Sequence, residues 1–102
     1  MRILTGVLLI VILQLPGLVA AETVSQYGAA LAHACVTCHG PEGRSQGAIP
    51  SLSILSSADI TTALQAFRAE TRPSTVMHRI AKGLDDTDIT AVATYFATLP
   101  RR

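Results

Sequence analysis

The stretch Cys35-Val36-Thr37-Cys38-His39 is the strongest local signal in this chain of 102 residues. Two cysteines three positions apart share one face of a helical turn, about 5–6 Å from each other. They can therefore bond to two neighbouring groups on one edge of a flat ligand, and the next residue, His39, is carried beneath it. The spacing matches the attachment sequence of haem c, so we expect thioethers from Cys35 and Cys38 and iron ligation by His39.

The same two thiols permit two other interpretations. A thiol-disulfide oxidoreductase would need a strand before the motif and a βαβ pattern around it, but a helical pattern precedes Cys35 and no strand is legible. A zinc site would need more ligands, and the remaining histidines, His33 and His78, do not recur at the paired spacing of zinc modules. Haem attachment is the favoured hypothesis, with these two as alternatives.

Met77 is the candidate for the second axial position of the iron. The chain has two methionines, and the other one, Met1, belongs to a segment that we expect to be removed. A thioether suits iron in an apolar crevice, and a Met/His pair leaves no open position for substrate, which favours an electron carrier over an enzyme. Met77 could instead be an ordinary core residue. His78 is the rival ligand, and His33 is expected at the surface.

The amino terminus has the three-part layout of a secretory signal. Arg2 precedes a mostly aliphatic run over residues 3–13, polar and helix-breaking residues follow, and Ala21 is a small residue suited to a cut before Glu22. The run is well short of the roughly 20 apolar residues that span a bilayer. The sequence therefore predicts export to the periplasm, cleavage after residue 21 and no membrane insertion, with one domain over residues 22–102.

The charge of that domain excludes one large class of partner. Removing Arg2 leaves seven basic and seven acidic residues, and the adjacent basic pair is Arg101-Arg102 at the very end. A nucleic-acid-binding surface needs clustered Lys and Arg. We therefore expect no nucleic-acid partner.

The hydrophobic pattern has helical spacing wherever it is regular, so the predicted fold class is all-α. We expect one helix from about Thr23 into Cys35, a second over about 57–70, a short one carrying Met77, and a last one near 86–98. Capping residues mark two of these starts: Ser56 with Asp59, and Asp85 with Asp88. The apolar positions expected to form the buried stripe of the first helix are Val24, Tyr27, Gly28, Leu31 and Ala34. Residues 40–55 are predicted to form a loop.

Beyond the motif, the chain resembles the class I cytochromes c, in which three to four helices wrap around one covalently bound haem. The resemblance rests on CVTCHG at 35–40, IPSL at 49–52 and the single later methionine. It is closer to the cytochrome subunit of flavocytochrome c sulfide dehydrogenase, through CHGPEGRSQGAIPSL and FRAETRPSTVMHRIAKGLDDTDITAVATYFATLP. In that family an Arg-x-x-Thr-x-Met-x-x-Ile-Ala-Lys-Gly segment holds the axial methionine, which is Met77 here.

The resemblance implies further site residues. Pro50 should present its carbonyl oxygen to the second ring nitrogen of His39, and the residues that should line the haem are Leu52, Leu64 and Ile80. Gly28 should lie where the first and last helices cross, against Tyr95 or Phe96. Two features depart from the family pattern: Glu70 stands where a glycine is usual, and SILSSADI follows IPSL in place of an Ala-Gly-Gln type of turn.

The function that the resemblance implies is one-electron transfer rather than catalysis. The haem subunit would accept electrons from a FAD-containing, sulfide-oxidising flavoprotein and pass them to a soluble acceptor. The alternative is a free-standing shuttle for another oxidoreductase or oxidase. Free shuttles often carry a charged docking face, so a formal charge of zero favours a bound subunit.

Overall fold

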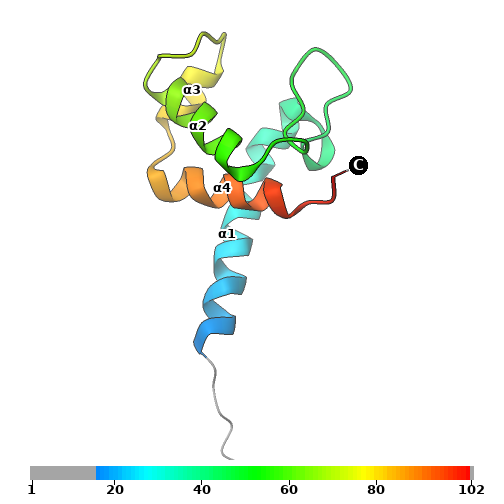
Figure 1. The fold of residues 1–102 in the computed structure, drawn as a ribbon, viewed down its shortest axis with the longest axis vertical. Coiled ribbons are helices and arrows are strands. Elements are labelled where there is room, and N and C mark those ends of the chain that lie inside the picture. The colour runs from blue at the N-terminus through cyan, green and yellow to red at the C-terminus, as the bar shows by residue number, and fades with distance from the viewer. Residues whose placement is uncertain (1–15, 102) are drawn as a thin grey trace, which may run out of the picture.

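The computed structural model describes residues 16–101, and every regular element within that range is helical (Figure 1). In chain order the elements are α1 (Pro16–His39), the short 3-10 turn η1 (Pro41–Gly43), α2 (Ser57–Arg68), α3 (Met77–Lys82) and α4 (Asp86–Thr98). The predicted all-α class is therefore confirmed for the described residues. None of the helices in this part of the chain is both long and apolar enough to cross a bilayer.

The first helix begins earlier than its hydrophobic pattern predicted. It starts at Pro16 rather than near Thr23, because proline is favoured in the first turn of a helix and the residues after Gly17 contain no strong helix breaker. Most of the predicted signal sequence, residues 1–15, lies outside the described residues. The expected cut between Ala21 and Glu22 falls within α1 and stays a prediction.

The first and last helices, α1 and α4, cross at the centre of the domain (Figure 1). Gly28 makes this crossing possible, because a Cβ atom there would lie 2.5 Å from the carbonyl oxygen of Ala91 and 3.2 Å from the Cβ of Tyr95. Of the two aromatic residues expected at the crossing, Tyr95 is the one beside Gly28. Phe96 is fully buried and lies under the loop, against Gly43.

Replacing Gly28 with alanine should force the two helices apart. Overpacking of this kind lowers the free energy of unfolding by about 1–3 kcal/mol, measured by thermal or denaturant unfolding of the haem-loaded protein. Gly47→Ala is the matched control, since no atom lies within 4 Å of a Cβ at Gly47. Equal stabilities of the two variants would show that the helices do not cross this closely.

A hydrogen bond also joins the two crossing helices. The Tyr27 hydroxyl donates to a carboxylate oxygen of Asp88 in the first turn of α4. This bond raises the pKa of the Tyr27 phenol and lowers the pKa of the Asp88 carboxyl. Asp88 also accepts from the backbone N–H of Asp85, so the capping box that starts α4 is tied to α1.

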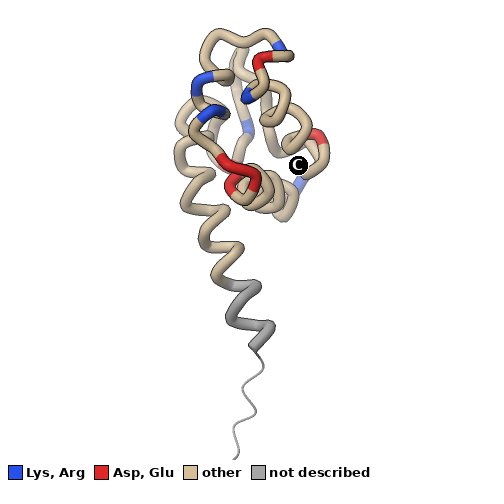
Figure 2. The backbone as a smooth tube through the Cα atoms, turned by 90° about the vertical axis from the view of Figure 1, so that its left-hand side faces the viewer, with Lys and Arg blue, Asp and Glu red and all other residues tan. Residues whose placement is uncertain are grey.

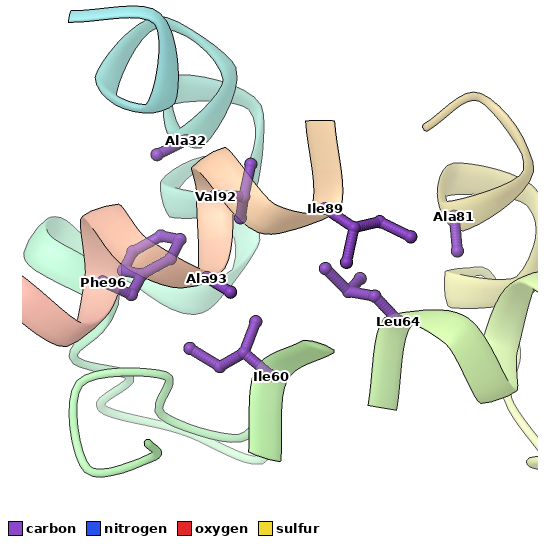
Figure 3. Close-up of a cluster of buried hydrophobic side chains, with 8 residues drawn as sticks. All are labelled: Ala32, Ile60, Leu64, Ala81, Ile89, Val92, Ala93 and Phe96. Carbon is purple, nitrogen blue, oxygen red and sulfur yellow. The ribbon is translucent and has the colours of Figure 1, made fainter. Parts of the chain in front are cut away.

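The hydrophobic core gathers around α4 (Figure 3). Ile60 and Leu64 of α2 point toward α4, and Ala81 of α3 and Ala32 of α1 complete the cluster. The residues that α4 contributes are Ile89, Val92, Ala93 and Phe96, which recur at helical spacing along one face. Among the residues whose side chains the structure describes, Phe96 and Ile89 are the two that are both large and fully buried, so this core is small.

The predicted stripe of α1 is wrong at its ends. Val24 and Tyr27 are 57% and 46% exposed, and Ala34 is exposed as well. The crossing at Gly28 turns the face that carries Gly28 and Ala32 toward α4, so Ala32 is the buried residue at 1% exposure. The direction of the crossing depends on α4, which lies far away in the sequence, and the periodicity of α1 alone does not specify it.

Candidate functional site

The Cys-x-x-Cys-His motif occupies the last turn of α1. Cys35 is half-buried, Cys38 is exposed, and both are free thiols. Burial raises the pKa of the Cys35 thiol, and the carboxyl end of a helix disfavours a thiolate further. Reactive redox cysteines have a lowered pKa, so this geometry argues against the thiol-disulfide oxidoreductase interpretation.

His39 closes α1 with its ring held in a fixed orientation. The side chain is buried, and Nδ1 lies 2.5 Å from the carbonyl oxygen of Pro50. Because a carbonyl only accepts hydrogen bonds, Nδ1 carries the proton and donates. In the neutral ring Nε2 is then the nitrogen without a proton, which is the form in which an imidazole binds a metal. The structure thus brings His39 and Pro50 together as the resemblance implied.

The loop between α1 and α2 carries Pro50 back to His39. Gly40 adopts φ +88°, and a Cβ there would lie 2.0 Å from the Arg44 carbonyl oxygen, so the sharp turn after His39 requires glycine. Farther along, the carbonyl oxygen of Gly43 accepts from the backbone N–H groups of Leu52 and Ser53, at 2.7 and 3.2 Å. These bonds fold the loop back on itself.

Met77 is the first residue of α3 and is half-buried. It packs against the hydrophobic cluster that contains Leu64, and Cys35 and Leu52 pack against this cluster as well. Four of the predicted site residues, from four separate segments, therefore converge on one core. The structure does not bring Ile80 into this cluster: its side chain is 43% exposed.

Several large apolar side chains are exposed in the loop and around α3. The large apolar side chains that remain exposed in the loop and in or beside α3 are Ile49, Ile54, Val76 and Ile80. Together with two free thiols and a histidine whose free nitrogen suits a metal, this surface fits a flat, apolar, metal-containing group such as haem.

The two histidines outside the motif are His78 and His33. Ser74 accepts from the backbone N–H of His78 at 3.0 Å, and its hydroxyl also lies 3.0 Å from Nδ1 of the His78 ring. The ring borders a shallow surface hollow with Glu70, Arg72 and Pro73. His33 is exposed, as predicted. Within residues 16–101 no three His, Cys, Asp or Glu side chains form a group that could hold a metal ion.

The fold and the site define a class: a small all-helical domain with a Cys-x-x-Cys-His motif ending its first helix. Comparison with protein families gives the same result, because the cytochrome c family model matches residues 25–100. The chain belongs to the cytochrome c family, and it is a class I c-type cytochrome with covalently bound haem c. It is accordingly a single-haem electron carrier.

Several curated proteins are similar to this chain. The cytochrome subunit of sulfide dehydrogenase from Chlorobaculum tepidum is 41% identical over 75 residues, which cover 74% of this chain and 68% of the relative. The thiosulfate dehydrogenase electron acceptor of Stutzerimonas stutzeri is 39% identical over 67% of this chain, but over only 33% of its own length. Cytochrome c-553 of Helicobacter pylori is 36% identical over 69% of this chain and 75% of the relative.

The features that sequence analysis missed are features of the backbone. The Gly43 carbonyl that anchors Leu52 and Ser53 is one of them, and the left-handed conformation of Glu70, at φ +58°, is another. The only available signal for the second was the family pattern, in which a glycine is usual at this position.

Proposed function

We propose that haem is attached through Cys35 and Cys38, with His39 and Met77 as the axial ligands of its iron. The contact between His39 and Pro50 is the observation that carries this proposal. It fixes both the orientation and the tautomer of the imidazole, as the carbonyl and carboxylate acceptors beside metal-binding histidines do. Met77 is the one thioether in the described residues, and it reaches the same core as Cys35.

Bound haem supplies an iron that changes oxidation state by one electron. The protein's own residues determine how this happens. His39 donates through Nδ1 to Pro50, which makes Nε2 a stronger electron donor. Met77 would hold the iron through its thioether, which would raise the reduction potential relative to a second nitrogen ligand. Leu52, Leu64 and Ile80 would line the haem and exclude water, and the exposed Pro50 would stay at the loop surface. With His39 and Met77 both bound to the iron, no position would be left for a substrate.

The partner that we propose is a FAD-containing flavoprotein that oxidises sulfide. The support is the 41% identity to a protein described as the cytochrome subunit of sulfide dehydrogenase, over 68% of its length. Charge adds to it: basic and acidic residues both occur around the domain, with acidic ones gathered at the start of α4 (Figure 2). A surface without one dominant sign of charge suits a lasting complex better than long-range steering of a free shuttle.

The proposed compartment is the periplasm, reached by export and removal of residues 1–21. Electrons would then pass from the flavoprotein through this subunit to a soluble acceptor. A free electron shuttle is the second candidate, and the likeness to cytochrome c-553 of Helicobacter pylori favours it.

The two candidates are separated by co-expression with an exported flavoprotein of the sulfide dehydrogenase class. We expect both chains to elute together in size-exclusion chromatography, and sulfide to reduce the haem in the complex, seen as the ferrous absorption spectrum. The cytochrome alone is the control, and sulfide should reduce it much more slowly. Monomeric elution, with equal rates of reduction in both samples, would contradict the flavoprotein partner and favour the free shuttle.

A further inference from the structure

The turn that ends α2 holds a residue in a strained conformation. The backbone N–H of Glu70 bonds to the Phe67 carbonyl at 3.1 Å, and that of Thr71 bonds to the Ala66 carbonyl at 3.0 Å. This pair of bonds is the Schellman motif, whose left-handed position usually holds glycine. Here it holds Glu70 at φ +58°. A left-handed conformation is unfavourable for a residue with a Cβ atom, so Glu70 weakens a turn that glycine would make without strain.

The Glu70 side chain makes a contact that glycine cannot provide. One carboxylate oxygen lies 3.0 Å from Nζ of Lys82, the last residue of α3. Arg68, two residues earlier in the same turn, donates to the Leu84 carbonyl at 3.1 Å and to Asp86 at 2.6 Å. The end of α2 is therefore bonded through side chains to the end of α3, to the turn that follows it and to the start of α4.

The position of α3 depends on such contacts. It has six residues, and Val76 at its N-cap makes no side-chain hydrogen bond to it, so its first turn is capped only by Ser74, whose hydroxyl accepts from the backbone N–H of His78. A helix this short is not stable by itself in water. Its one fully buried side chain is Ala81, which offers little apolar surface. The orientation of α3 also sets the orientation of Met77, its first residue.

We propose that Glu70 is a positioning residue for Met77. Its ion pair with Lys82 holds α3 in the orientation that keeps the thioether on the iron, and the strained backbone at residue 70 persists because only a side chain with a carboxylate makes this pair. This inference rests on the proposed ligation by Met77. At residue 70, glycine would therefore favour the stability of the turn, whereas glutamate favours the bond between Met77 and the iron.

Glu70→Gly tests this opposition. Removing the strain should leave the melting temperature of the haem protein unchanged or raise it by a few degrees. Removing the carboxylate should loosen α3, so that added imidazole displaces Met77 from the ferric protein more readily. The pair is exposed, so we expect the imidazole affinity to rise by about two- to fivefold. A spectroscopic imidazole titration measures it.

Glu42→Gly is the matched control. Glu42 also has a positive φ, +56°, and also forms an ion pair, but its partner Arg44 lies two residues away in the same loop. The melting temperature of this variant should also stay unchanged or rise by a few degrees. Its imidazole affinity should equal that of the unmodified protein. Glu70→Gln and Lys82→Gln should each raise the imidazole affinity, and the double variant should show no further rise, because both single changes break one pair.

Three results would overturn the proposal. The first is that Glu70→Gly and Glu70→Gln leave the imidazole affinity unchanged while Met77→Ala raises it. Ligation by Met77 would then stand, and only the role of Glu70 would be wrong. The second is a rise in imidazole affinity in Glu70→Gly that accompanies a fall in melting temperature, which indicates general loosening. The third is an imidazole affinity that Met77→Ala itself does not change. That result would remove the proposed ligand and the inference together.

Discussion

Serine at both Cys35 and Cys38 is expected to leave the purified protein without covalently bound haem. The hydroxyl of serine forms no thioether, so haem is retained only by its axial ligands and is lost on denaturation. Haem staining after denaturing electrophoresis should fall from about one haem per chain to none. Each single serine variant should also be impaired, since one of the two links is missing.

Thr37→Ser is the control for this experiment. Thr37 lies between the two cysteines and is exposed, and its hydroxyl bonds to the His33 carbonyl at 3.3 Å, which serine can also do. This variant should stain like the unmodified protein. Undiminished staining of the double cysteine variant would show that the haem is attached elsewhere.

The haem-free chain should also be poorly folded. In the described part of the chain, the core has two large, fully buried side chains, Phe96 and Ile89, and domains of this size usually depend on a cofactor, a metal or disulfides. Once its non-covalent haem has been removed, the double cysteine variant should therefore lose helical circular dichroism as well. The haem acts here as a part of the core.

Met77→Ala should keep its covalent haem but open one face of the iron. Loss of the thioether leaves the sixth position to water or an added ligand, and loss of the Met/His pair lowers the reduction potential. Carbon monoxide should bind to essentially all of the ferrous variant and to almost none of the unmodified protein, as measured by absorption spectroscopy.

His78→Ala distinguishes Met77 from its rival. The His78 ring is in contact with Ser74 on the side of the surface hollow, so this variant should not bind carbon monoxide. Binding by His78→Ala combined with none by Met77→Ala would reverse the assignment of the ligand.

Local sequence signals predicted those parts of the fold that depend on few residues. The capping boxes at Ser56–Asp59 and Asp85–Asp88 are both present, and they start α2 and α4 where expected. Each depends on contacts between residues three positions apart, which a sequence pattern can reveal. The predicted end of α2 is wrong by two residues: the helix stops at Arg68 and not at Glu70, because Glu70 adopts the left-handed conformation.

Features that depend on distant contacts were beyond the sequence pattern. Apolar spacing marked Val24 and Tyr27 as buried, but the crossing with α4 at Gly28 leaves both exposed. The contact between Pro50 and His39 spans a loop whose path is set by the Gly43 carbonyl. Only the family resemblance indicated that contact, since nothing in the composition of residues 40–55 specifies how the loop returns.

The measurement that tests this account most directly is the intact mass of the protein, purified in denatured form from a host that matures c-type cytochromes. We expect one species with the mass of residues 22–102 plus a single haem, and a peptide carrying Cys35 and Cys38 that bears the added porphyrin. A mass equal to that of the unmodified polypeptide would contradict the account.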